Sequence, residues 1–407
     1  MPERRGLARA GTLVGLGAIA VLAVVRTALA QRLVDAPRPA APADDLARAD
    51  VLVPVRSGDP LLPGRLALQA EALAPARVRL LVDDDDPAGI AAADHAADGR
   101  AHVAVVACPP PAPGTNPKTH KLALAAAGSD DVVVMLDDDA VLPAGGLARL
   151  VGGLGADGDG AGGDGAALVT GIPVYSAEGG RWSTLVAAFV NSSALPTYLA
   201  LAASGPPISV NGMVLATRRR HLAAIGGLER LLDATCDDYA IALAFRRHGL
   251  PIAQLAEPVV LATTVDSAAA YARLMRRWMM FAHEVVRRDL SPRFVLLVLV
   301  PAALPLITLA AAVGAGGAWP AAVLALLGGQ SAGTRALRRR LVPDGAVHTS
   351  PARTLVLETL ALLLAPAHAV AAIGVRTVRW RGRLVRVGVG RAAGPVRRSR
   401  ARIGHGR

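Results

Sequence analysis

Three consecutive aspartates, Asp137, Asp138 and Asp139, follow the apolar run Val132–Leu136 and precede Pro143. Side chains alternate along a strand, so the carboxylates of Asp137 and Asp139 should point the same way. Two such carboxylates suit one hard divalent cation, Mg²⁺ or Mn²⁺, shared with a diphosphate. The cation would neutralise charge that develops on a leaving diphosphate. A solvated acidic turn is the alternative, and the strand before it and the proline after it disfavour that alternative.

Two further polar clusters fit a nucleotide. The acidic run Asp83–Asp86 ends directly before Pro87, and one of its carboxylates could bond a nucleoside. The chain has 44 lysines and arginines together, yet its lysines are only Lys118 and Lys121. A lysine where arginine is otherwise used indicates a need for a compact ammonium, which suits a nucleotide phosphate or base. A plain acidic turn and a chance pairing of lysines are the alternatives.

Asp237 and Asp238 open a predicted helix that ends near His248. The helix dipole favours carboxylates at such a start, which is the structural explanation. The catalytic explanation is a general base at the mouth of a site, which takes the proton from an acceptor hydroxyl. We predict the catalytic role for this pair.

Arg273, Arg276, Arg277 and Trp278 lie on a predicted helix just before an apolar segment. Residues three or four apart share a helix face, so Arg273 can act with either of the other arginines. The arginines could hold a diphosphate or position the acceptor, and the tryptophan could line the site. The alternative is a basic helix bound to lipid headgroups.

These clusters require an arrangement that brings strand ends together. Short apolar runs alternate with Ala- and Leu-rich stretches, which predicts an α/β sheet. The runs are nearly continuous in apolar residues, as expected for parallel strands covered on both faces. Ligands should lie at the carboxyl ends of the strands, where the aspartates are. The predicted strands are Val51–Val55, Val78–Val82, His102–Ala107 and Val132–Leu136, and the predicted helices are Leu66–Leu73, Gly89–Ala97 and Lys121–Ala127.

Apolar runs at both ends of the chain predict membrane attachment. Leu7–Leu29 is long enough to span a bilayer, and we interpret it as an uncleaved anchor rather than a signal peptide. Phe294–Val313 can also span, and Trp319–Leu327 can return as the second half of a hairpin. Leu355–Val375 either spans or lies in the interface. The arginines of Arg338–Arg340 and of the tail favour a hairpin with an interfacial segment.

Composition agrees with a membrane enzyme. The 407 residues are 53% hydrophobic, with a mean hydropathy of +0.41 and a formal charge of +12. The predicted division is an anchor and linker over residues 1–48, a catalytic domain over 49–290, and membrane helices with a basic tail over 291–407. We expect a multi-pass protein of the cell membrane, with its catalytic domain facing the cytoplasm and its basic ends on lipid headgroups.

Other classes of protein fit this composition less well. Arginines without interleaved aromatics exclude nucleic acid as a partner. The two cysteines, Cys108 and Cys236, show neither zinc spacing nor a disulfide framework. The Gly-, Ala- and Asp-rich stretch Gly152–Gly165 predicts a flexible insertion rather than a phosphate loop.

In their order along the chain, these segments resemble the ceramide glucosyltransferases and, more widely, the large inverting family with the GT-A fold. The likeness runs from about Val51 to Val387. Asp86 and Asp137 match the first and second aspartates of that family, and Asp238 matches the aspartate taken as its catalytic base. The other similar segments are Gly114–Lys118, Val210–Met213, Ile225–Leu228 and the ending Trp380–Arg383.

The resemblance implies a GT-A, Rossmann-like domain that binds a nucleotide sugar, with an N-terminal membrane anchor and C-terminal membrane helices. It places Asp86 and Lys118 on the nucleotide, and Asp238, beside Asp237, as the base. Three departures stand out, one of them the extra Gly152–Gly165 stretch. Asp139 restores the second acidic residue that this family usually lacks, and Arg277 intrudes before Trp278, so the arginine that matches the family's (Gln/Arg)-x-x-Arg-Trp motif stays open.

The function expected from the resemblance is inverting transfer of a hexose, glucose first, from a UDP-sugar to a lipid hydroxyl such as that of ceramide. A processive polysaccharide synthase and a polyprenyl-phosphate sugar transferase are the enzymatic alternatives. The synthase would need more spanning helices than this chain offers. An inactive, membrane-anchored nucleotide-sugar-binding protein is the alternative from another class.

Overall fold

The computed structural model describes residues 2–155, 165–342, 350–380 and 383–390. Most of the predicted insertion Gly152–Gly165, part of the Trp380–Arg383 ending and the basic tail from residue 391 lie outside these ranges.

A mixed sheet of eight strands forms the centre of the domain, in the order β3-β2-β1-β4-β7-β6-β8-β5. The strands β3, β2, β1 and β4 are parallel, β7 is antiparallel to β4, and β6 pairs in parallel with β8. The bounds are β1 Ala49–Pro54, β2 Arg77–Asp83, β3 Val103–Cys108, β4 Val132–Leu136, β5 Ala140–Val141, β6 Leu168–Tyr175, β7 Val214–Arg218 and β8 Ile252–Leu261. The four predicted strands are confirmed, and they make up the parallel part of the sheet.

Helices cover both faces of this sheet. Val51 and Val134 pack with α3 and α4 on one face, whereas Leu52 and Met135 pack with α5 and α9 on the other. Among the four predicted strands, β3 departs from the expected coverage by helices on both faces. It is an edge strand of the sheet and leaves Ala104 exposed. The helices of this part are α2 Ala43–Ala47, α3 Leu62–Ala72, α4 Pro87–Ala97, α5 Pro117–Ala126, α6 Gly146–Gly152, α8 Arg219–Ala224, α9 Asp237–Arg247 and α10 Ala268–Asp289.

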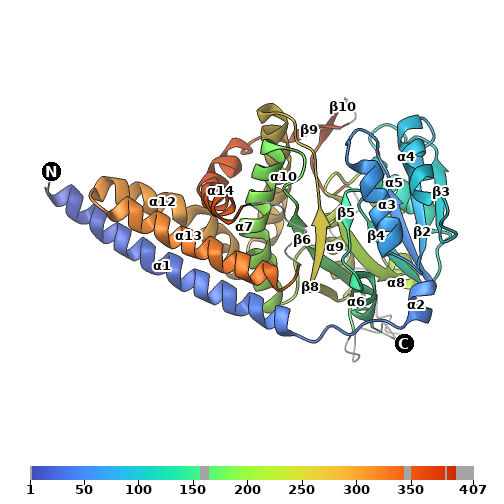
Figure 1. Cartoon of the computed structure of the whole chain (residues 1–407), viewed down its shortest axis with the longest axis horizontal. Helices are drawn as coiled ribbons and strands as arrows, with labels where there is room; N and C mark the ends of the chain where they lie inside the picture. The colour runs from blue at the N-terminus through green and yellow to red at the C-terminus, as the bar shows by residue number, and fades with distance from the viewer. Residues whose placement is uncertain (1, 156–164, 343–349, 381–382, 391–407) are drawn as a thin grey trace, which may run out of the picture.

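Long apolar helices extend from one side of the sheet domain (Figure 1). Four described segments are long and apolar enough to cross a membrane: Glu3–Asp35, Arg181–Ala203, Pro292–Ala315 and Ala352–Ala371. They belong to α1 (Pro2–Asp35), α7 (Arg181–Ala203), the run from α11 (Pro292–Phe294) into α12 (Val300–Ala315), and α14 (Pro351–Ala371). The predicted hairpin is present, because α13 (Trp319–Arg339) follows α12 after a short turn and packs against it.

The helix α7 has no counterpart among the predicted elements. Its apolar window is 67% buried, against 22% for the other three candidate spans. It packs on β6 and against α1 and α14, so it lies between the sheet and the apolar bundle. Its hydropathy is therefore explained in large part by burial inside the protein.

Small residues let α1 and α12 approach closely. Gly11 and Gly15 have the four-residue spacing of a Gly-x-x-x-Gly helix contact. A Cβ at Gly15 would overlap the side chain of Thr308, and Thr308 is 1% exposed. This contact binds the predicted anchor to the C-terminal hairpin.

After α14 the chain returns to the sheet domain through a hairpin of β9 (Thr377–Trp380) and β10 (Arg383–Arg386). The backbone N–H groups of Thr235 and Cys236 then donate to Gly388 O at 3.0 and 3.2 Å, and Gly388 N donates to Thr235 Oγ1 at 2.9 Å. Val389 is buried beside them. The C-terminal segment thus docks directly before the first residue of α9.

The glycine contact can be tested with a matched pair of substitutions. Gly15→Ala forces a methyl group into Thr308, and such overpacking typically costs about 1–3 kcal/mol. The detergent-solubilised variant should unfold several degrees lower than the wild type in a thermal melt. Gly17→Ala is the control, because its Cβ would meet nothing within 4 Å. Equal melting temperatures for the two variants would contradict the packing described.

Candidate active site

The turn Asp137–Asp139 follows the carboxyl end of β4 and is fixed by three other segments. Its first carbonyl accepts a hydrogen bond from Gln69 Nε2 of α3 at 2.6 Å. Its second carboxylate accepts the backbone N–H of Arg56, after β1, at 2.8 Å. Its third carboxylate accepts the hydroxyl of Thr263, after β8, at 3.1 Å. The turn is therefore held rigid by backbone and side-chain donors from across the sheet.

Lys118 lies at the centre of the acidic cluster. Its Nζ is 2.5 Å from Asp137 Oδ1 and 3.6 Å from Asp237 Oδ2, and it donates to Gly212 O at 2.9 Å. Burial opposes its charge, but the two aspartates raise the pKa of Lys118 well above its ordinary value. The lysine is thus a fixed cation that joins β4, α9 and the loop before β7.

Local sequence explains how Lys118 reaches this place. Asn116 caps α5 by accepting the backbone N–H of Lys118 at 3.0 Å, and Pro117 occupies the first helical position, where its missing N–H is harmless. The Asn116 Nδ2 group donates to Ala234 O at 2.9 Å, just before α9. The Asn-Pro-Lys sequence therefore starts a helix and ties it to the segment that leads into Asp237.

Asp238 follows in the first turn of α9. Burial and the neighbouring Asp237 raise the pKa of Asp238 to about 6. A Cβ at Gly212 would lie 3.1 Å from Asp238 Cβ, so the loop before β7 passes close against this side chain. Gly212 thus contacts Asp238 on one side and Lys118 on the other, which brings the predicted base and the predicted nucleotide ligand together.

Of the predicted arginines, the structure brings Arg277 to the cluster. Its charge acts on Asp137, Asp139 and Asp237. The adjacent Trp278 packs edge-on against Tyr175 at the end of β6, with 6.0 Å between ring centroids. Arg277, next to Trp278, is therefore the arginine whose charge acts on the cluster, and its role in the Arg-Trp motif stays a prediction.

Arg273, Arg276 and Arg277 are all exposed on α10. Among the described residues, no ion pair joins any of the three to the acidic cluster, and only the charge of Arg277 acts on it. Their predicted contact with acceptor or diphosphate stays a prediction.

The first acidic run divides into structural and exposed residues. Asp83 is buried and lies 3.3 Å from Lys121 Nζ, which also donates to Val55 O at 2.6 Å. Asp86 caps α4, and it accepts the backbone N–H groups of Ser57 and Gly89, each at 3.0 Å. Burial opposes its charge, but these donors lower the pKa of Asp86. The capping role is visible, and the role on the nucleotide stays a prediction.

Two residues that hold the site were not predicted. Gln69 is fully buried on α3 in the apolar stripe with Leu66 and Ala70, and a lone amide in such a stripe is a recognisable signal. Tyr175 is held by Asn191 of α7, which accepts its N–H at 2.9 Å and donates to its carbonyl at 2.8 Å. No sequence pattern connects those two positions.

The donor set suits a divalent cation. Burial, with Asp137 and Asp138, raises the pKa of Asp139 to about 8, and burial and Asp137 raise the pKa of Asp138 to about 6. Carboxylates that disfavour each other's charge in this way gain from a cation between them. The described residues contain no group of three or more His, Cys, Asp or Glu side chains arranged around one ion. The role of Asp137 and Asp139 as ligands of one cation therefore stays a prediction.

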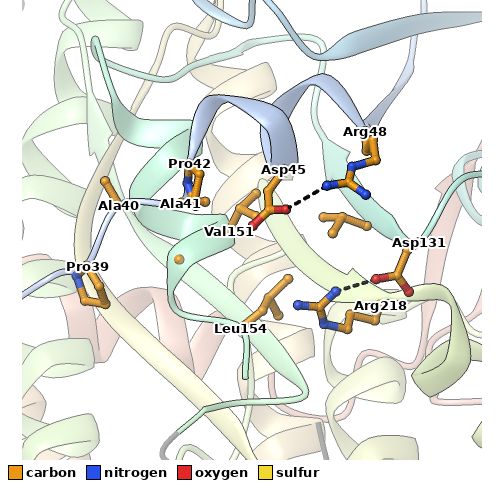
Figure 2. A pocket seen from close by; sticks show the side chains of 12 residues that line it. Pro39, Ala40, Ala41, Pro42, Asp45, Arg48, Asp131, Val151, Leu154 and Arg218 are labelled. Atoms are coloured by element: carbon orange, nitrogen blue, oxygen red, sulfur yellow. Dashed lines mark hydrogen bonds and ion pairs between the residues drawn. The ribbon is translucent and has the colours of Figure 1, made fainter. Parts of the chain in front are cut away.

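A separate cavity lies at the opposite end of β4 (Figure 2). It has a volume of about 380 Å³ and is bordered by the linker residues Pro39–Pro42, Val132 and Val151. Its charged groups are paired with each other, Asp131 with Arg218 and Asp45 with Arg48. Because Val132 begins β4 and Asp137 follows its end, this cavity is not part of the candidate site.

Comparison with known proteins agrees with this arrangement. The sequence profile described as glycosyl transferase family 21 matches residues 18–393. The fold is similar to that of a mannosyltransferase from Pyrobaculum calidifontis solved with GDP-Man and Mn²⁺, at 20% identity over 90% of this chain and 99% of that one, with a TM-score of 0.51. A glucosyl-3-phosphoglycerate synthase from Mycobacterium tuberculosis matches at 20% identity over 62% of this chain and 84% of that one, with a TM-score of 0.36. A search among curated proteins found no match.

The crowded carboxylates predict how stability depends on pH. Asp138, Asp139 and Asp238 have folded-state pKa values above 3.8, so these three groups bind more protons in the folded protein than in the unfolded chain between pH 3.8 and about 8. Stability should therefore fall as pH rises through this window in cation-free buffer, and Mn²⁺ should restore it at the upper end. Thermal melts at a series of pH values measure both effects.

Asp139→Asn should flatten this pH dependence, whereas the exposed Asp84→Asn should not. A wild-type melting temperature that stays constant across the window, or that Mn²⁺ leaves unchanged at high pH, would contradict the electrostatics of the cluster.

Proposed function

Because this chain belongs to glycosyl transferase family 21, the ceramide glucosyltransferase-like family, and has the GT-A fold, we propose that it transfers a hexose, glucose first, from a UDP-sugar to a lipid hydroxyl such as that of ceramide. One observation carries the proposal. Lys118, Asp137 and Asp238 come from three separate elements and converge at the carboxyl end of one strand. That convergence supplies a nucleotide cation, a metal ligand and a base in one place.

The donor half of the reaction concerns the diphosphate. Asp137 and Asp139 would hold Mg²⁺ or Mn²⁺, and the ion would supply charge neutralisation for the leaving UDP. Lys118 is already a cation at this position, and Arg277 adds a second positive charge from α10. When UDP leaves, these two side chains would stabilise the charge that collects on its oxygens. Asp86, after β2, is proposed to orient the nucleoside.

The acceptor half needs a base. In a single displacement the lipid oxygen bonds to the anomeric carbon, the bond from that carbon to the UDP oxygen breaks, and configuration inverts. The hydroxyl proton passes to the Asp238 carboxylate, with Asp237 beside it. A pKa of about 6 leaves Asp238 ionised at neutral pH and basic enough to accept the proton.

The path of the chain supports a definite arrangement in the membrane. The segment around Gly388 docks on the same domain from which α10 leads into α11 and α12. The chain between them must therefore cross the bilayer an even number of times. We propose that the α12–α13 hairpin makes the two crossings, with α14 at the interface and α1 as the separate anchor; the proposal rests on the packing of α13 against α12, because hydropathy alone selects α14 rather than α13 as a span. Arg338 and Arg339 at the domain end of α13 favour a cytoplasmic domain.

The first test is a transfer assay with membranes that contain this protein. Labelled UDP- and GDP-sugars should be offered with ceramide, diacylglycerol or polyprenyl phosphate as acceptor. We expect a labelled lipid from the wild type, and a loss of roughly 10²–10⁴-fold in kcat from Asp238→Asn, the usual worth of a general base. Because the base is ionised only above its pKa of about 6, wild-type kcat should rise as pH passes that value.

Full turnover by Asp238→Asn would contradict the assignment of Asp238 as the base. Metal-dependent UDP binding without any product would favour the inactive binding protein, and a polymeric product would favour the synthase.

A second test decides among the arginines of α10. Arg277→Ala should lower kcat by roughly 10²-fold, because it removes a charge aimed at the leaving group. Arg276→Ala is the matched control one position away, and it should retain kcat while weakening binding to vesicles with anionic lipid. Equal loss of turnover in both variants would contradict the distinction drawn between them.

A further inference from the structure

Asp289, the last residue of α10, stands at an electrostatically unfavourable position. The carboxyl end of a helix carries partial negative charge, so a carboxylate there is repelled unless it has a partner. Asp289 has two. Arg246 donates to its carboxylate through Nη1 at 2.6 Å and Nη2 at 2.7 Å, and Tyr239 Oη donates to Oδ2 at 2.6 Å.

Both partners lie on α9. Tyr239 and Arg246 are seven residues apart, which places them on the same face of the helix two turns from each other. Tyr239 is 1% exposed, and the Asp289 side chain is 16% exposed. Burial opposes the charge of Asp289, but the donors on α9 lower its pKa. The Arg246 side chain is 31% exposed, so this is a two-point, partly buried attachment rather than a surface ion pair.

The attachment joins the two helices that bring side chains to the site. Tyr239 follows Asp238 directly, and Asp289 ends the helix that carries Arg277 and Trp278. Phe281 and Val285 of α10 pack on the core that contains α9, so the polar contact lies at the end of an apolar one.

At its other end α10 is held separately from α9. Tyr271 Oη lies 3.0 Å from His368 Nε2 of α14. Among the described residues, the hydrogen bond that joins α10 to Tyr239, the residue next to the predicted base, lies at the Asp289 end of the helix. Beyond that end, Ser291 caps α11, from which the chain enters the apolar bundle.

We propose that Asp289 is a positioning residue that, by holding Tyr239 and Arg246, fixes the start of α9 and its base against α10. This role rests on the proposed transfer function. Tyr239, the tyrosine of the Asp-Asp-Tyr sequence, would then act by binding Asp289 and not by contact with substrate. The base accepts the proton of the acceptor, whereas Arg277 acts on the leaving group. A shift between α9 and α10 would therefore lower turnover without removing either group.

The test compares Tyr239→Phe, Asp289→Asn and the double variant. Tyr239→Phe keeps the buried ring and removes only the hydroxyl, so it remains informative even where Asp289→Asn folds poorly. Each single variant should lose roughly 10- to 100-fold in kcat, as expected for small misplacement of a catalytic group. The affinity for UDP with Mn²⁺ should stay unchanged. The double variant should be no slower than the slower single variant, because both remove one attachment.

Asp130→Asn is the matched control. It removes a carboxylate whose ion pair with Arg77, at 2.9 Å, lies on the exposed surface away from the site. This variant should keep wild-type kcat. Wild-type turnover in Tyr239→Phe and Asp289→Asn, or a loss of UDP affinity in proportion to kcat, would overturn the positioning role.

A second measurement does not depend on turnover. Amide hydrogen exchange over residues 237–241 should be faster in Tyr239→Phe than in the wild type, because the first turn of α9 loses its attachment. If the wild type binds UDP but glycosylates no acceptor, the proposed function fails while this exchange difference still supports the attachment. Unchanged exchange overturns the attachment whatever the assay shows.

Discussion

The ion pair between Lys118 and Asp137 is the constraint on which the site depends. The ammonium group also contacts Asp237 and the carbonyl of Gly212, so one charge fixes a strand end, a helix start and the loop between them. Without that cation, the carboxylates that gather here would repel one another and the loops would separate. The same crowding leaves several acids with raised pKa values, which is the state expected of a site that takes up positive charge with its substrate.

Buried polar contacts also join the sheet domain to the apolar helices. Arg338 of α13 lies 2.9 Å from Glu358 of α14 and donates to the backbone carbonyl of Asn191 in α7 at 3.3 Å. Asn191 in turn holds Tyr175, against which Trp278 packs. A buried charge pair of this kind is costly unless its partners are well placed, so it specifies one arrangement of the three helices. The apolar helices and the residues of the candidate site therefore belong to one packed structure (Figure 1).

Sequence patterns predicted the parallel half of the sheet because its strands are continuous apolar runs with clear breaks. They also predicted the Asp137–Asp139 turn and Lys118, where unusual residues follow a strand or open a helix. The antiparallel half of the sheet and α7 were not predicted. The apolar residues of α7 are buried both by the sheet and by the neighbouring apolar helices. The sequence also did not predict that Arg277, rather than Arg276, acts on the acidic cluster, and the reason is different. It depends on the rotation of α10 about its axis, which is set by Trp278 packing on Tyr175 and not by residue type.

The contact between Gly388 and Thr235 can form only late in the synthesis of this protein. The two residues are 153 positions apart, and all of α12, α13 and α14 are made between them. At about 5–20 residues per second, the ribosome needs roughly 8–30 s to reach the glycine after it has made the threonine. Through that interval the donors in front of Asp237 lack their final partner. The nascent chain therefore completes the neighbourhood of Asp237 and Asp238 only after all of its C-terminal apolar helices have been made.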